Sequence, residues 1–244
     1  MTHKFTRIIL FSACATVISM FTAAAAPCTP GSLASYIALG ATGCTIGNDT
    51  FFDFQLVSDS STGGATAIPA SDITVEGLGP SGTTGASAVA PFLSSDVGVD
   101  FSTVWAATAG ETLDDDISFS VSVGGGAASI TDAGLVQDSY TTGNGNVTVT
   151  EKGCSGITYP CNQIWGVDTN DTSFVADTIF SSTGTLSVEK DIAISANAGT
   201  AGVSSVADVF STSAVPEPRS LSLFLGLALV AGFAFKKKLQ GAKA

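Results

Sequence analysis

The sequence predicts an all-β domain, an antiparallel β-sandwich or jelly-roll-like ectodomain, with one short N-terminal helix and a single C-terminal transmembrane helix. About ten short segments rich in β-branched and aromatic residues follow one another along the chain. Turn-forming Gly, Ser, Thr, Asn and Asp separate them at intervals of roughly 10–20 residues, as in a sandwich. The clearest segment, residues 117–123, alternates four apolar residues with three serines, which is the period of a half-buried strand.

One helix is expected before the strands begin. Ser32 can cap its N-terminus, Leu33, Tyr36 and Ile37 share one face, and Gly40 can end it. The strands are expected after Cys44. Their ranges are 50–57, 72–76, 97–106, 117–123, 147–150, 164–167, 174–180, 185–195 and 203–212, with a long loop at 79–88.

The N-terminus has the composition of a secretory signal peptide. Lys4 and Arg7 precede the apolar stretch 8–21, and the small residues 23–26 supply a cleavage site, with the best cut after Ala25. The chain therefore divides into a signal peptide, a secreted domain, a linker and a C-terminal sorting signal. Their ranges are 1–25, 26–210, 211–214 and 215–239.

The cysteines predict two local disulfides. Cys14 is lost with the signal peptide, unless it is the acylated residue of a lipoprotein leader, which is the alternative. The other four, Cys28, Cys44, Cys154 and Cys161, allow three connectivities in an exported chain. Their grouping favours Cys28–Cys44 and Cys154–Cys161. Zinc is the competing use, but there are no histidine partners and no C-x₂-C pairs.

The charge of the exported segment is strongly acidic. Seven of the nine basic residues and the acidic residue Glu217 lie in the terminal segments. Residues 26–214 therefore carry 20 acidic residues against Lys152 and Lys190, a net charge of −18. Such a surface repels nucleic acid and anionic lipid headgroups. It is expected to be solvated, although it can also attract divalent cations.

The chemistry of the exported segment is limited by the absence of histidine. The single histidine, His3, lies in the leader, so Ser-His-Asp triads, Cys-His pairs and histidine-ligated metals are excluded. Lys190, between Glu189 and Asp191, is expected to be a charged, paired lysine rather than a base. We therefore expect no enzyme activity, no catalytic residue, no cofactor and no assigned metal ligand.

Carboxylates are the remaining candidates for chemistry. Glu111 with Asp114, Asp115 and Asp116, or Asp168 with Asp171, can in principle serve a carboxylate-dependent hydrolase. The runs 114–116 and 168–171 also supply the oxygen atoms that calcium prefers. Four aromatic residues can stack on sugar rings if they are exposed. These are Trp105, Tyr140, Tyr159 and Trp165.

The C-terminus carries the most specific pattern in the chain. It consists of Val215, Pro216, Glu217, Pro218 and Arg219, an apolar run at 220–235, and Lys236, Lys237 and Lys238. The prolines prevent a helix from running in from the preceding domain. The 16 residues of this run give a helix of roughly 24 Å, and snorkelling basic side chains extend the span. The lysines predict a cytoplasmic end with the N-terminal domain outside.

This order of Val-Pro-Glu-Pro, apolar helix, basic cluster and chain end resembles the PEP-CTERM sorting signal of Gram-negative bacteria. The same tail is also named the ice-binding protein C-terminal motif, which implies nothing about ice. The resemblance implies an exosortase-type processing transpeptidase as partner, a cut near the Pro-Glu-Pro, and a precursor anchored in the inner membrane. A plain C-terminal anchor shares every feature except the Pro-Glu-Pro.

Together these features predict an exported structural protein of the cell surface or extracellular matrix, associated with exopolysaccharide or biofilm. The alternative is a carbohydrate- or calcium-binding adhesive module, and a carboxylate-dependent hydrolase comes third.

Overall fold

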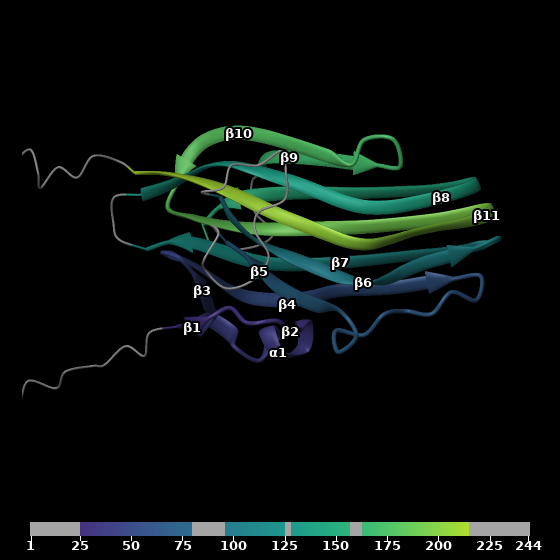
Figure 1. Cartoon of the computed structure of the whole chain (residues 1–244), viewed down its shortest axis with the longest axis horizontal. Helices are drawn as coiled ribbons and strands as arrows, with labels where there is room; N and C mark the ends of the chain where they lie inside the picture. Colours follow the sequence, from purple (N-terminus) through teal and green to yellow (C-terminus); the bar gives the residue numbers. More distant parts are fainter. Residues whose placement is uncertain (1–24, 80–95, 125–127, 157–162, 215–244) are drawn as a thin grey trace, which may run out of the picture.

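The computed structural model describes residues 25–79, 96–124, 128–156 and 163–214 of the chain. These residues are mostly strand, with two short helices near the N-terminus (Figure 1), and the predicted all-β class is confirmed. The helices are α1 Leu33–Ile37 and η1 Gly40–Thr42. The strands are β1 Ala26–Pro27, β2 Gly31–Ser32, β3 Cys44–Ile46, β4 Asp49–Thr62, β5 Thr74–Leu78, β6 Val97–Thr108, β7 Glu111–Val123, β8 Ala128–Ser155, β9 Gln163–Asn170, β10 Val175–Thr183 and β11 Thr185–Ala214.

The described strands form one sheet that curls over, so that its two halves face each other as two layers (Figure 1). Layer A has the strand order β10-β8-β11-β6-β5-β2, and layer B has the order β9-β8-β11-β7-β4-β3-β1. Strands β8 and β11 belong to both layers because each runs along one layer, crosses over and returns in the other. Every pairing except the short β1–β3 contact is antiparallel among these strands.

The passage of β8 and β11 from one layer to the other depends on two facing glycines. Gly143 of β8 and Gly199 of β11 have φ values of 64° and 99°, which side chains with a Cβ rarely adopt. A Cβ at Gly199 would clash with the carbonyl oxygen of Thr142, and a Cβ at Gly143 would clash with that of Ala198. The two long strands therefore bend together at this point and stay paired as they pass between the layers.

Phenylalanines fill the space between the layers. Phe51 and Phe54 come from β4 and Phe119 comes from β7, all in layer B. Phe101 of β6 and Phe210 of β11 come from layer A. All five are buried, and the rings of Phe54 and Phe119 stack with their centroids 5.6 Å apart. The apolar faces that the strand alternation predicts therefore meet in one shared core.

The N-terminal helix matches its prediction at the start and differs at the end. Ser32 caps α1, its hydroxyl oxygen accepting from the backbone N–H of Ser35 at 3.2 Å. Leu33 and Tyr36 are buried, but Ile37 is 36% exposed, and the helix ends at Ile37 rather than near Gly40. Gly40, whose φ of 53° is left-handed, instead lies at the start of the 3₁₀ turn η1.

The expected linker is part of the sheet. Residues 211–214 continue β11 and pair with the first residues of β8, from Ala128 to Asp132. Serine and threonine dominate this segment, and this composition predicts a linker. Such residues can also occupy a strand, as they do here. The signal peptide up to residue 24, the sorting signal at 215–239 and the apolar run at 220–235 lie outside the described residues. Within the described part of the chain, no helix is long and apolar enough to cross a bilayer.

The first predicted disulfide is present. Cys28 and Cys44 are bonded, with their Cα atoms 4.8 Å apart, and the bond fixes the residue after β1 to the start of β3. Cys154 is buried and disulfide-bonded, while Cys161 lies outside the described residues. The Cys154–Cys161 pairing therefore stays a prediction.

We expect non-reducing peptide mapping to link Cys154 to Cys161 and Cys28 to Cys44. The 16-residue separation of the first pair makes that bond worth roughly 3 kcal/mol in the chain-entropy model. Reduction should therefore lower the melting temperature while the domain stays folded at room temperature. A peptide joining Cys44 to Cys154 would contradict the pairing.

Candidate functional site

Three aspartates converge on the outer face of layer B. Asp114 and Asp116 are two residues apart on β7, so their side chains leave the same face of the strand. Asp191 of β11 is the direct cross-strand partner of Asp116. One carboxylate oxygen of each residue lies within 4.8 Å of the others. Oxygen atoms in this arrangement are the ligand type that calcium prefers.

The like charges of this cluster lie close together. Burial raises the pKa of Asp191, and the neighbouring charges of Asp114 and Asp116 raise it further, while Lys152 lowers it. The Oδ1 atom of Asp191 is buried and has no hydrogen-bond partner among the described residues. Ser58 of β4 donates its hydroxyl to Asp116 Oδ2 at 2.6 Å. The three carboxylates therefore repel one another, and few neighbouring groups offset this repulsion.

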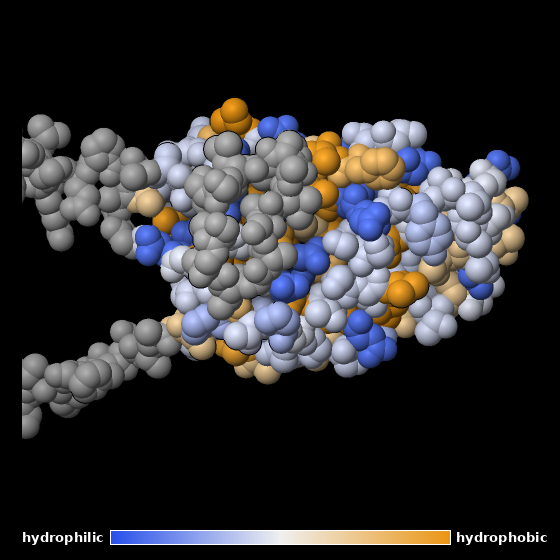
Figure 2. All heavy atoms as spheres, viewed as in Figure 1, coloured by the Kyte–Doolittle hydropathy of each residue, from blue (hydrophilic) through white to orange (hydrophobic). Residues whose placement is uncertain are grey.

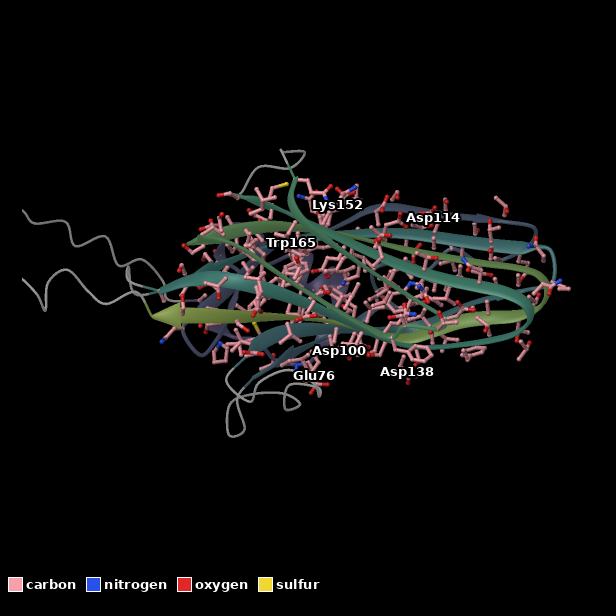
Figure 3. The ribbon with its side chains drawn as sticks, turned by 90° about the horizontal axis from the view of Figure 1, so that it is seen from above. Glu76, Asp100, Asp114, Asp138, Lys152 and Trp165 are labelled. Atoms are coloured by element: carbon pink, nitrogen blue, oxygen red, sulfur yellow. A yellow bond between two sulfur atoms is a disulfide. The ribbon has the colours of Figure 1, made fainter. Side chains whose placement is uncertain are left out.

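Acidic side chains also lie on the opposite side of the molecule. Figure 3 shows Asp114 and Lys152 on one side of the ribbon, and Glu76, Asp100 and Asp138 on the other. Lys152 pairs with Glu189 at 2.8 Å, and its side chain is 37% exposed. Both outer faces of the sandwich therefore present carboxylates, as the net charge of the exported segment predicts.

The run 114–116 does not act as one oxygen-rich loop. It lies within strand β7, so Asp115 points inward while its two neighbours point outward. Asp115 is fully buried and accepts a hydrogen bond from Trp105 Nε1 at 2.8 Å. Burial raises the pKa of Asp115 to about 6, against the lowering effect of that hydrogen bond. The third carboxylate of the cluster belongs to Asp191, which lies 75 residues from Asp116 in the sequence.

The second expected run, 168–171, is divided between a strand and a turn. Asp168 is exposed on β9, and Asn170 ends that strand. The Asn170 side-chain oxygen accepts from the backbone N–H groups of Thr172 and Ser173, which closes the turn to β10. Among the described residues, neither Asp168 nor Asp171 belongs to a cluster of potential ligands.

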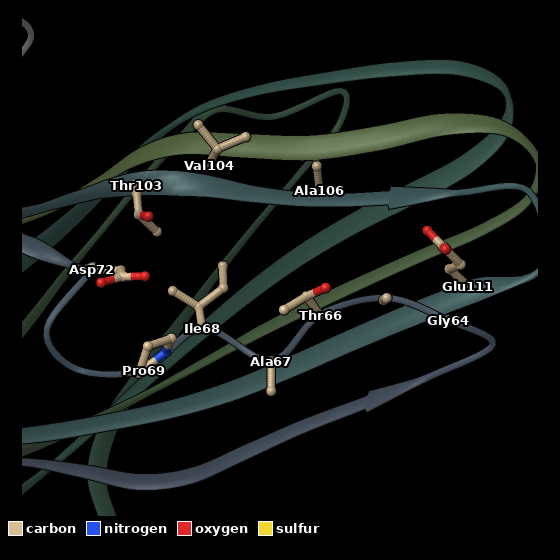
Figure 4. A pocket seen from close by; sticks show the side chains of 11 residues that line it. Gly64, Thr66, Ala67, Ile68, Pro69, Asp72, Thr103, Val104, Ala106 and Glu111 are labelled. Carbon is tan, nitrogen blue, oxygen red and sulfur yellow. The ribbon is translucent and has the colours of Figure 1, made fainter.

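An open pocket of about 390 Å³ lies between the segment after β4 and the outer face of β6 (Figure 4). Ile68 and Val104 form part of its wall, and Asp72 and Glu111 lie at opposite ends of it. Glu111 Oε2 accepts from the backbone N–H of Thr108 at 2.7 Å and from its hydroxyl at 2.8 Å. These hydrogen bonds lower the pKa of Glu111, which disfavours a role as general acid.

Glu111 and the aspartates of β7 lie in different surroundings. Glu111 lines the pocket, whereas Asp114 and Asp116 belong to the cluster on the outer face of layer B. The predicted grouping of Glu111 with Asp114, Asp115 and Asp116 is therefore divided between the pocket, the outer cluster and the interior.

The aromatic candidates for sugar stacking are mostly internal. Trp105 is fully buried, and Trp165 is 5% exposed with its ring stacked on Phe180 at 5.6 Å. Tyr140 is 49% exposed and lies across Gly202 on the neighbouring strand. Tyr159 lies outside the described residues. Neither tryptophan offers a free ring face for a sugar.

We expect sodium and calcium chloride to raise the melting temperature equally when their ionic strengths are matched. Salt screens the repulsion between like charges, and the Debye length is about 10 Å at 0.1 M. The Asp191→Asn variant should be more stable than the wild type at low salt, because it removes a partly buried charge from a cluster of like charges. A rise in melting temperature that is specific to calcium, and is lost in Asp191→Asn but kept in Asp168→Asn, would contradict this expectation.

Comparisons with known proteins do not identify a family. No family model matches the chain, and no curated protein matches it. A solved structure of TmCBM61 in complex with beta-1,4-galactotriose aligns at 15% identity over 66% of this chain and 90% of that chain, with a TM-score of 0.32. The Glycosylation Associate Protein (Gap123) complex from Streptococcus agalactiae aligns at 12% identity over 57% of this chain and 26% of that chain, with a TM-score of 0.26. Such low scores say nothing about what this chain binds.

Proposed function

We propose that the chain is an exported structural protein of the bacterial cell surface or extracellular matrix, delivered by its C-terminal sorting signal. The observation that carries the proposal is the order of Val215 to Pro218, the apolar run 220–235 and the lysines 236–238. The proposed partner is an exosortase-type processing transpeptidase. The apolar run anchors the precursor in the membrane until the tail is cut. Exopolysaccharide is the matrix that we propose surrounds the processed protein.

The placement of the chain ends supports this proposal. Strand β11 ends at Ala214, and Val215 of the sorting signal is the next residue. Strand β1, which starts next to the proposed signal-peptide cut, lies at the same end of the molecule as the C-terminal end of β11 (Figure 1). Both terminal signals therefore join the domain at the same end, and their removal leaves the described sheet intact.

The character of the domain supports a structural role rather than catalysis. Residues 26–214 contain no histidine, and the two lysines in this segment are both paired with carboxylates. The face of the molecule in Figure 2 has mainly hydrophilic and neutral residues, with small separate apolar areas. Such a surface keeps a secreted domain hydrated and dispersed in a polysaccharide layer.

A calcium-binding adhesive module is the second candidate, favoured by the convergence of Asp114, Asp116 and Asp191. The matched sodium and calcium melts described above separate it from the structural role. A carbohydrate-binding role has less support, because both tryptophans are buried.

Replacing Pro216, Glu217 and Pro218 by alanine in the producing cell tests the sorting proposal. The apolar run and the lysines stay, so the variant should still insert in the membrane. We expect the wild-type domain in the surface and extracellular fractions and the variant in the inner-membrane fraction. The matched control replaces Ser211, Thr212 and Ser213 by alanine and should behave as wild type. Equal amounts of variant and wild type at the surface would refute recognition of the Pro-Glu-Pro.

A further inference from the structure

Three ionisable side chains meet in the apolar space between the two layers. Lys190 of β11 and Glu151 of β8 are direct cross-strand partners in layer B, and Asp208 comes from the returning half of β11 in layer A. The side chains of all three are fully buried. Strand alternation places Lys190 on the inward face, whereas its neighbours Glu189 and Asp191 lie on the outward face.

The lysine amine contacts both carboxylates directly. Lys190 Nζ donates to Glu151 Oε2 at 2.8 Å and to Asp208 Oδ1. The ring of Phe101 lies beside it, with its centroid 5.9 Å from Nζ. The other carboxylate oxygens, Glu151 Oε1 and Asp208 Oδ2, are buried and have no hydrogen-bond partner among the described residues. The amine, the two carboxyl groups and the aromatic wall form a site without access to water.

The charges of this site are unbalanced, because one ammonium group faces two carboxyl groups. Burial raises the pKa of Asp208 well above its usual range, and the charge of Glu151 raises it further, against the effect of Lys190. Burial lowers the pKa of Lys190, but the attraction of Asp208 and Glu151 outweighs this effect, so the amine is an ammonium group at rest. A neutral Asp208 carboxylic acid next to this ammonium group balances the site.

We propose that Lys190 and Asp208 condense to an intramolecular amide bond, with Glu151 as the group that moves the proton. The contact between Nζ and the Asp208 carboxyl group carries the proposal, together with the burial of all three side chains. The reaction class is the self-catalysed condensation of an amine with a carboxylic acid.

The reaction balances without any external reactant. The Glu151 carboxylate takes one proton from the Lys190 ammonium group, which frees the nitrogen lone pair. Nζ attacks Asp208 Cγ and forms the C–N bond. A second proton of the nitrogen passes to the hydroxyl group of Asp208, which leaves as water when the C–O bond breaks. The products are one secondary amide, one water molecule and a protonated Glu151, with no net change of charge.

Burial is the reason that condensation is favoured at this place. Separated charges are costly in this interior, because the dielectric constant is low and water is excluded. The neutral amide and the released water molecule are therefore favoured over the charged side chains. The surface pair of Lys152 and Glu189 has the same groups at 2.8 Å, but its lysine is 37% exposed, so water keeps it an ion pair. The amide would tie layer A to layer B across the bend at Gly199, which strengthens the domain against unfolding.

Tryptic mapping of the reduced, denatured full chain tests the bond. Trypsin does not cut after an acylated lysine, so the wild type should give one peptide from Gly153 to Arg219. Its mass should be that of the sequence less one water. A protease that cleaves before aspartate should separate the peptide that contains Lys190 from the peptide that contains Asp208. The amide bond should keep these two peptides covalently joined. Complete cutting after Lys190, with both peptides at their sequence mass, would overturn the proposal.

Variants assign the roles of the three groups. Asp208→Ala should be cut after Lys190 and keep its full mass, and Glu151→Gln should give the crosslinked peptide slowly or not at all. The matched control, Lys152→Arg, keeps the trypsin site and should crosslink as wild type does. Crosslinking of Glu151→Gln at the wild-type rate would contradict the role of Glu151. If a variant does not fold, the wild-type map alone decides whether the bond exists.

Discussion

Replacing Phe119 by alanine is expected to lower the free energy of unfolding by about 3–5 kcal/mol. The ring of Phe119 lies within 6.3 Å, centroid to centroid, of the rings of Phe51, Phe54, Phe101 and Phe210. These partners come from both layers, so alanine would leave a cavity at the centre of the core. The surrounding strands are fixed by their pairing and can close it only in part.

Urea denaturation of the purified protein measures this loss. Val104→Ala is the matched control, because Val104 lies on the neighbouring layer and is 76% exposed. A surface change of this kind should alter the free energy by less than about 0.5 kcal/mol. A loss below about 1 kcal/mol for Phe119→Ala would mean that the two layers do not share one packed core.

Removing Lys190 is expected to have a comparable effect, because it takes away the partner of both carboxyl groups and the proposed amide bond. Lys190→Met leaves Glu151 and Asp208 together in the interior with no positive charge, which should cost about 3–5 kcal/mol. The triple variant Lys190→Met, Glu151→Gln and Asp208→Asn should recover part of this loss, because it leaves no charge at this site. Neither variant can form the proposed amide bond, so the difference between them isolates the cost of the stranded carboxyl groups.

The same change at the surface provides the control. Lys152→Met breaks the ion pair with Glu189, which is partly exposed, and should cost less than about 1 kcal/mol. If Lys190→Met and the triple variant unfold at the same urea concentration, the buried charges are not the source of the instability.

The fold class was predictable because local patterns reflect it directly. The alternation at 117–123 predicted a strand where β7 lies, although Ser118 and Ser120 are buried as well as the apolar residues, and Ser32 caps α1 as predicted. The crossing of the long strands was not predictable. The ranges 185–195 and 203–212 read as two strands, but they are two halves of β11 joined at Gly199. Gly199 indicates a turn in the sequence, but in the structure it lies at the bend where β11 passes from one layer to the other. This bend depends on the pairing of β11 with β8.

The candidate sites depend still more on pairing across the sheet. The predicted run 114–116 contributes two of the three outer carboxylates, but the third, Asp191, arrives only through the β7–β11 register. The sequence also predicted a paired Lys190, with its neighbours as the nearest acids. Alternation turns those neighbours outward, and the partners are Glu151 and Asp208 from other parts of the sheet. No local pattern in the sequence indicates such contacts.

The intact mass of the protein extracted from the cell surface tests the central claim, export and sorting by the C-terminal signal, most directly. The account predicts a chain that starts at Ala26 and has lost residues 220–244. A surface protein that retains its full C-terminus through Ala244 would contradict processing at the sorting signal and would indicate a permanent membrane anchor.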